Sequence, residues 1–384
     1  MAGLETECLR LERELLSGQW RPGGYVTIRI EDPKPRVVSA ALFRDRVVHH
    51  ALCAVIEPLF ERGFVFDSYA NRVGKGTHRA LERYERYRDR HPFVLRADIY
   101  RYFPAIDHAI LKRDILRRIA CVATLDLCDR IIDGSNPQEP VEIYYPGDDL
   151  LTPFDRRRGL PIGNLTSQFF ANLYLDPLDH YVKEVLRAPG YVRYVDDFAV
   201  FHDNPERLEE WRRAIGRFLE GRRLRLHPAK TGIRASAEPA EFLGFVTMPG
   251  RRLLPEANIR RFRNRLRGLR DRWRAGSVDL EHVKIRVSAW IAHAAWADTR
   301  GLRHAIFRGG VFDPDLGPDR SPAGARRAAG RGTTNRQTCA WRSAEHGVLY
   351  HHVSQQPNFV FSTRLSETAA RGWCRVADAT SSWR

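Results

Sequence analysis

The feature that most constrains this chain is a pair of adjacent acids inside an apolar, β-prone run from Tyr191 to Phe201. Asp196 and Asp197 follow Tyr-Val-Arg-Tyr-Val and precede Phe-Ala-Val-Phe, which predicts two strands with the acids at the turn between them. Neighbouring carboxylates in such a hairpin lose water and repel each other, and a bound divalent cation removes both penalties. The pair therefore indicates a metal site, with a solvated Asp-Asp turn as the alternative.

A third acid, Asp98, ends a second apolar strand pattern that begins at Phe93, far ahead of Asp196 in the chain. Three carboxylates from two strands could hold two cations roughly 4 Å apart, an arrangement suited to phosphoryl transfer. Taken alone, an acid at a strand end is as well explained as a helix cap or a turn residue. The combination with the hairpin is what favours a metal centre.

The chain has 384 residues and a net charge of +16, which predicts a polyanionic partner, either nucleic acid or an anionic membrane surface. No apolar run approaches the roughly 20 residues that span a bilayer. Acids rather than bases follow Met1, so we expect no secretory signal. The six cysteines lack metal or disulfide spacing, which predicts a reduced, cytoplasmic protein.

Residues 250–308 are predicted to form a basic helical region. An apolar stripe with helical spacing runs through Ile259, Phe262, Leu266, Leu269 and Trp273. Arginines fill most other positions, so we expect the helix to pack by its stripe and to follow a phosphate backbone, with a plain surface helix as the alternative. The arginines expected to contact nucleic acid are Arg260, Arg263, Arg267, Arg270 and Arg274.

These features resemble a reverse transcriptase over roughly residues 30 to 300. The motifs that carry the resemblance are Ser68–Arg72 in the fingers, Asp98–Phe103 and Tyr194–Asp197 in the palm, Leu226–Thr231 with its lysine, and Glu241–Phe245, which resembles a primer-gripping hairpin. The resemblance implies an α+β right-hand polymerase whose palm is an antiparallel sheet with helices. The implied parts are 1–95 (N-terminal segment and fingers), 96–248 (palm, with a fingers insertion at about 120–170), 250–308 (thumb) and 309–384 (a tail of uncertain order).

The resemblance also implies roles for individual residues. The catalytic residues would be Asp98, Asp196, Asp197 and Lys230. Two Mg²⁺ ions, or Mn²⁺ in their place, would be held at Asp98, Ile99, Asp196 and Asp197. The dNTP substrate would be bound at Arg72, Lys75, Phe103, Ile162, Gly163 and Gln168. Phe242 and Gly244 would join the thumb arginines in holding the template RNA and the RNA/DNA duplex.

Physical reasons support several of these roles. The Phe103 ring would clash with a ribose 2′-hydroxyl and so favour dNTPs, with a core phenylalanine as the alternative. Arg72 could clamp phosphates in bidentate fashion, and Lys75 could do so or be a solvated loop charge. Lys230 could protonate pyrophosphate or only neutralise charge, and Gly163 would let the backbone approach the nucleotide.

A narrower resemblance follows from residues 159–168, where Ile162 and Gln168 stand in place of the glutamine and proline of many reverse transcriptases. This swap, with the insertion at 134–156, resembles the reverse transcriptases of bacterial and phage diversity-generating retroelements. It implies cDNA copied from a template-repeat RNA with errors at adenines, mutagenic retrohoming into a target gene, and a small, basic accessory protein that forms a helical oligomer. Isoleucine cannot donate a hydrogen bond to the nucleotide, so we predict that Ile162 lowers fidelity about tenfold, unless it merely packs.

Three alternatives stay open. A group II intron-type maturase would add a splicing domain, and a defence-associated reverse transcriptase is disfavoured by Ser167-Gln168. A non-catalytic RNA-binding module would have no use for three converging acids.

Overall fold

The computed structural model describes residues 2–31, 36–136, 138 and 143–308. The expected tail at 309–384 and five positions of the 134–156 insertion lie outside these residues. Contacts divide the described chain after Pro255 into two compact units, which are described separately below.

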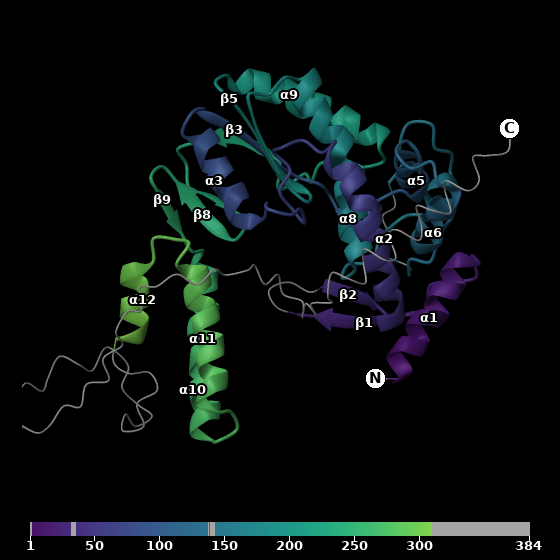
Figure 1. Ribbon diagram of the computed structural model, residues 1–384. Coiled ribbons are helices and arrows are strands. Elements are labelled where there is room, and N and C mark those ends of the chain that lie inside the picture. The colour runs from purple at the N-terminus through teal and green to yellow at the C-terminus, as the bar shows by residue number, and fades with distance from the viewer. Residues whose placement is uncertain (1, 32–35, 137, 139–142, 309–384) are drawn as a thin grey trace, which may run out of the picture. The chain divides into compact units, whose positions relative to one another are not determined.

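The first unit is built around a four-stranded antiparallel sheet with the order β4-β5-β3-β6. Its strands are β3 (Phe93–Asp98), β4 (Gly190–Tyr194), β5 (Asp197–His202) and β6 (Gly232–Ala235). The expected hairpin is present as β4 and β5, and β3 lies directly beside β5 (Figure 1). The two acidic segments, distant in sequence, therefore meet at one end of the sheet.

The two faces of this sheet pack against different helices. Tyr84 and Tyr87 of α3 (Thr77–Arg88) contact the Phe201 ring at centroid distances of 5.1 and 5.7 Å. Phe198 lies on the opposite face of the sheet and belongs to the main hydrophobic core, which also includes residues of α9 (Pro205–Gly221). Because strand side chains alternate, Asp98 and Asp197 lie on the face opposite Phe198, shared with Phe201.

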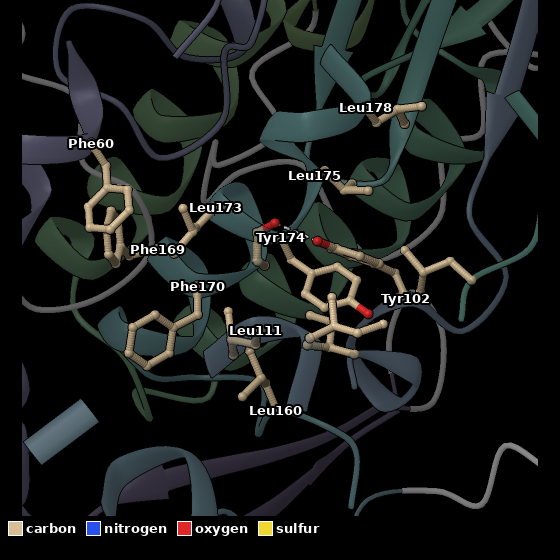
Figure 2. Close-up of a cluster of buried hydrophobic side chains, with 14 of the residues drawn as sticks. Phe60, Tyr102, Leu111, Leu160, Phe169, Phe170, Leu173, Tyr174, Leu175 and Leu178 are labelled. Carbon is tan, nitrogen blue, oxygen red and sulfur yellow. Dashed lines mark hydrogen bonds between the residues drawn. The ribbon is translucent and has the colours of Figure 1, made fainter. Parts of the chain in front are cut away.

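The main core forms around α8 (Leu165–His180), a helix buried on nearly all sides. Figure 2 shows six of its apolar residues, from Phe169 to Leu178, among side chains of other elements. They include Phe60 from α2 (Phe43–Glu61) and Leu111 from α5 (His108–Leu116). Twelve of its sixteen residues are buried, and they include the polar side chains of Asn172, Asp176 and Asp179, so α8 lies inside the unit rather than at its surface.

The remaining elements of the first unit complete this frame. They are α1 (Ala2–Leu16), β1 (Tyr25–Ile30), β2 (Arg36–Ala41), α4 (Tyr102–Ala105), α6 (Val122–Asp133), α7 (Thr152–Asp155), the π-helix η1 (Tyr181–Val185), β7 (Ala240–Phe242), β8 (Phe245–Met248) and β9 (Arg251–Leu253). β1 and β2 form an antiparallel hairpin, and β7, β8 and β9 form a small antiparallel sheet.

The second unit contains α10 (Glu256–Arg274), α11 (Leu280–Ala294) and α12 (Arg300–Phe307). Phe262 and Leu266 of the expected stripe are buried, and Phe262 stacks on Trp290 of α11 at a centroid distance of 3.7 Å. Across the described ranges, no helix has the length and apolar character needed to cross a membrane.

Candidate active site

Three aspartates lie at one end of the central sheet. Asp98, the last residue of β3, is the register partner of Asp197, the first residue of β5. Asp196 lies in the two-residue turn between β4 and β5, and its carbonyl accepts a hydrogen bond from the Ile99 N–H at 3.2 Å. The pairing of β3 with β5 thus joins the acid at a strand end to the acids of the hairpin.

The turn that carries Asp196 has an unusual backbone. Val195, its first residue, has a φ of +57°, a region that β-branched residues rarely adopt. Such a conformation costs of order 1–3 kcal/mol and persists only where the surrounding structure enforces it. The turn that carries the Asp196 carboxylate is therefore held in place by contacts from outside the turn.

Both hairpin carboxyls titrate abnormally. Burial and the neighbouring Asp98 raise the pKa of Asp196 to about 6. Burial raises the pKa of Asp197 to about 6, and the nearby Arg96 partly opposes this shift. The folded protein thus concentrates negative charge where water is scarce, which is the condition that a cation relieves.

Lys230 lies at this site. Its ammonium donates to Asp98 Oδ2 at 2.8 Å, and the side chain remains about half exposed. The segment that carries it is fixed by the His227 N–H, which donates to the Asp98 carbonyl at 2.7 Å. The lysine can therefore reach a group bound beside Asp98.

Arg96 forms an ion pair with Asp197. Two residues before Asp98 on the same strand face, its guanidinium lies 3.4 Å from Asp197 Oδ2. It also donates to the Glu241 carbonyl of β7, and its guanidinium carbon lies 5.5 Å from the Phe242 ring centroid. Arg96 thus connects Asp197 to the β7–β8 hairpin.

In the residues that the structure covers, no three His, Cys, Asp or Glu side chains already form a cluster able to hold a metal ion. The donor chemistry nevertheless fits a hard cation, because Mg²⁺ often takes only one or two protein carboxylates and completes its shell with water and substrate phosphates. Asp98 and Asp196 repel each other and both offer oxygen ligands. Ile99 contributes backbone here, since its side chain is buried in the main core.

Mg²⁺ should raise the melting temperature of the protein at about pH 8, and much less at about pH 5. The ion binds ionised carboxylates, and those with a pKa of about 6 are largely protonated at the lower pH. Thermal melts with and without Mg²⁺ at both pH values measure this. Equal stabilisation at both would place the ion elsewhere, and Asp196→Asn should remove most of the effect.

The expected phosphate clamps have protein partners in this structure. The Arg72 guanidinium binds Glu61 at 2.7 Å and donates to the carbonyls of Val65 and Ser68. The Lys75 ammonium donates to the Phe66 carbonyl and lies 3.3 Å from the Phe66 ring centroid. Arg72 is only 5% exposed, so binding a phosphate would require it to leave these partners.

The other expected nucleotide contacts lie on α4 and around the start of α8. Phe103 is half-buried against the main core. The Ile162 carbonyl accepts from the Ser39 N–H of β2 at 2.8 Å, and its side chain is half-buried. Gly163 has a φ of +120°, and a Cβ there would meet Val38 at 2.8 Å, so only glycine fits. Gln168 is half-buried in the first turn of α8.

The two expected contacts in the β7–β8 hairpin differ. The Phe242 ring is fully buried and stacks on Tyr84 at 4.6 Å, so it could not stack on a base without leaving the core. Gly244 has a φ of +83° in the turn, is exposed, and a Cβ built there would have no neighbouring atom within 4 Å. Backbone at Gly244 is therefore more accessible to a nucleic acid than the Phe242 ring.

Sequence reasoning missed four residues that shape this site. They are Arg36, Arg96, Arg193 and Asn164. The charge of Arg36 lowers the pKa of Asp196, Arg96 contacts Asp197, and Arg193 is buried beside the turn. The Asn164 side-chain amide bridges Ser39 and Ala41 of β2. The signal for Arg96 and Arg193 was present, since each is a base inside an otherwise apolar strand. Arg36 and Asn164 act through long-range pairing that local pattern does not reveal.

Comparison with known proteins gives a family and several relatives. The model of the family described as reverse transcriptase (RNA-dependent DNA polymerase) matches residues 28–247. Protein YkfC of Escherichia coli (strain K12) is 25% identical over 283 residues, which cover 63% of this chain and 71% of that protein.

Among solved structures, telomerases show a weak similarity to this chain. Telomerase from Candida albicans, in complex with a fragment of telomeric RNA, gives a TM-score of 0.44 at 14% identity, over 62% of this chain and 46% of that one. Apo telomerase from Candida tropicalis, truncated from its C-terminal domain, gives a TM-score of 0.42 at 13% identity. The match covers 62% of this chain and 55% of that one. The chain thus spans about half the length of these telomerases.

Proposed function

Because this chain belongs to the reverse transcriptase (RNA-dependent DNA polymerase) family, we propose that it copies a template-repeat RNA into cDNA, with errors at template adenines, for targeted gene diversification. Its enzyme class is that of an RNA-directed DNA polymerase. The observation that supports polymerase chemistry is the pairing of Asp98 with Asp197 on adjacent central strands, with Asp196 at the turn. The retroelement part of the proposal is supported by Ile162 and Gln168 in the sequence.

The carboxylates of Asp98, Asp196 and Asp197, with the backbone of Ile99, would hold the divalent cations. The Arg96 guanidinium lies beside Asp197 and would orient its carboxylate. Bound there, Mg²⁺ would neutralise phosphate charge and favour ionisation of the primer 3′-hydroxyl. Lys230, beside Asp98, is placed to give a proton to the departing pyrophosphate. Phe103 would exclude the 2′-hydroxyl, and Arg36, Arg72 and Lys75 would hold the triphosphate.

Nucleic acid would be bound mainly through the basic face of α10. Arg260, Arg263 and Arg267 are exposed on the side of the helix away from the buried Phe262 and Leu266. Their spacing follows one helical face, which suits a phosphate backbone. A small, basic accessory protein would join through RNA rather than by direct contact, since two basic surfaces repel. We place the reaction in the cytoplasm of a bacterial or phage-infected cell.

Ile162→Gln should lower the error frequency at template adenines roughly fivefold to tenfold. An added hydrogen bond to the nucleotide is worth on the order of 1 kcal/mol, and 1.36 kcal/mol corresponds to a factor of ten. Deep sequencing of cDNA made by the variant measures this. Ile162→Leu is the matched control, because it keeps an apolar side chain and should leave the frequency unchanged. An unchanged frequency in Ile162→Gln would exclude this residue from the cause of infidelity.

The function as a whole is tested by cDNA synthesis on a defined, primed RNA with Mg²⁺ and four dNTPs, followed by deep sequencing. Errors concentrated opposite adenines would support the retroelement proposal. Accurate DNA would instead favour a maturase or a defence enzyme. Continued absence of product after addition of accessory protein and cognate RNA would favour an RNA-binding module.

A further inference from the structure

Arg193 of β4 is a fully buried arginine next to the carboxylate turn. Its side chain is 1% exposed and that of its ion-pair partner, Asp179 of α8, is 0% exposed. The guanidinium Nε and Nη2 donate to the two Asp179 oxygens at 2.6 and 2.5 Å. Burial alone would lower the pKa of Arg193, but Asp179 outweighs it and raises that pKa, so the guanidinium stays charged. Such a bidentate pair fixes the guanidinium plane.

The other hydrogen bonds of Arg193 reach the turn, a neighbouring loop and Asn172 of α8, whose Oδ1 accepts from Nη1 at 3.3 Å. Nη1 donates to the carbonyl of Val195 at 2.9 Å, the residue with the positive φ. Nη2 donates to Ser68 Oγ at 3.1 Å. The backbone of Arg193 is also paired with this loop, since its N–H donates to Asp67 O and its carbonyl accepts from Tyr69 N–H, both at 2.9 Å. One residue therefore joins the turn, α8 and the loop that leads to Arg72.

We propose that Arg193 is a positioning residue that holds Val195 in its strained conformation and thereby sets the place of the Asp196 carboxylate. The inference rests on the proposed function, in which Asp196 is a metal ligand. A β-branched residue at positive φ relaxes unless an outside group restrains it. The hydrogen bond to the Val195 carbonyl is such a restraint, and Asp179 orients the donor that makes it.

The proposal makes a specific prediction about Val195. Arg193→Lys keeps a positive charge beside Asp179 but loses the planar fork, and should lower kcat on the order of a hundredfold, since small misplacement of reacting groups has effects of that size. KM for primer–template should change little. Val195→Gly alone should lower kcat only about threefold, because glycine adopts a positive φ without strain. In the double variant, glycine should restore kcat roughly tenfold relative to Arg193→Lys.

This double-mutant cycle separates positioning from simple structural support. Purified full-length variants are compared for kcat, KM and melting temperature on primed RNA. A structural ion pair predicts independent effects, so a double variant whose loss equals the product of the single losses overturns the proposal. If Arg193→Lys does not fold, Asp179→Asn replaces it in the same cycle, because it keeps the shape while weakening the orientation of Arg193.

Failure of this inference is distinguishable from failure of the proposed function. Asp196→Asn is measured in parallel. If that variant keeps full activity, the assignment of the metal ligand is wrong and the cycle loses its premise. If it is inactive while the cycle gives independent effects, only the role of Arg193 is wrong.

Discussion

Replacing Asp196 with asparagine should lower the rate of DNA synthesis roughly a thousandfold. Metal coordination supplies several kcal/mol of transition-state stabilisation, and each 1.36 kcal/mol is a factor of ten. The fold should survive. Because burial raises the pKa of Asp196 to about 6, its ionisation above that pH disfavours the folded state. An amide cannot ionise, so the melting temperature at about pH 8 should stay the same or rise. Single-turnover dNTP incorporation and thermal melts measure both effects.

Asp203→Asn is the matched control, because this acid follows the other end of β5 and its side chain is 71% exposed. It should change the rate by less than about twofold, as expected for a surface position. Full activity in Asp196→Asn would contradict the assigned metal site. Inactivity with a lower melting temperature would instead indicate a folding defect.

Binding of primed RNA should depend steeply on salt through α10. Each phosphate contact contributes about 0.9 to the slope of log affinity against log salt for duplex DNA, a value that we apply to the hybrid as an estimate. Five arginine contacts would therefore lower affinity on the order of 500-fold between about 50 and about 200 mM salt. Replacing Arg260, Arg263 and Arg267 with glutamine removes three of these contacts. The loss of affinity over the same salt range should then fall from about 500-fold to on the order of 10-fold. Fluorescence anisotropy over a salt series measures the slope.

Three arginines on α9 provide a control with the same change in charge. Arg207, Arg212 and Arg213 pair with Glu210 and Glu209 of their own helix. Their replacement by glutamine should leave the slope almost unchanged, because they already have partners. Equal slopes in both triple variants would show that non-specific charge, rather than the face of α10, governs binding.

The acidic hairpin and the basic helix were predictable from sequence because their signals are local, whereas the α+β right-hand polymerase fold followed from the family resemblance. The apolar, β-prone segments on either side of the acid pair predicted the β4–β5 hairpin, and the helical spacing from Ile259 to Trp273 predicted α10. Asp98 was recognisable only in combination with the hairpin, since nothing local shows that β3 pairs with β5. Family motifs supplied that step.

The partners of individual side chains were less predictable. Arg72 lies within a motif expected to contact a triphosphate, yet in this structure its guanidinium binds Glu61 and two backbone carbonyls. Phe242 was expected at a nucleic-acid surface, and its ring is buried against Tyr84. Both outcomes depend on packing between segments that the sequence pattern does not align. The proposed roles of both in binding remain predictions.

The position of the acids on the two inner strands also affects how the enzyme is made. β3 pairs with β5 and β6, which the ribosome synthesises long after Asp98 has emerged. Contacts so distant in sequence form late, because the intervening chain must first be closed into a loop. A nascent chain that ends before Lys230 cannot hold Asp98 in its final surroundings. Polymerase activity should therefore be absent from nascent chains that end before the palm sheet is complete, and it should rise only after α10 has also been synthesised.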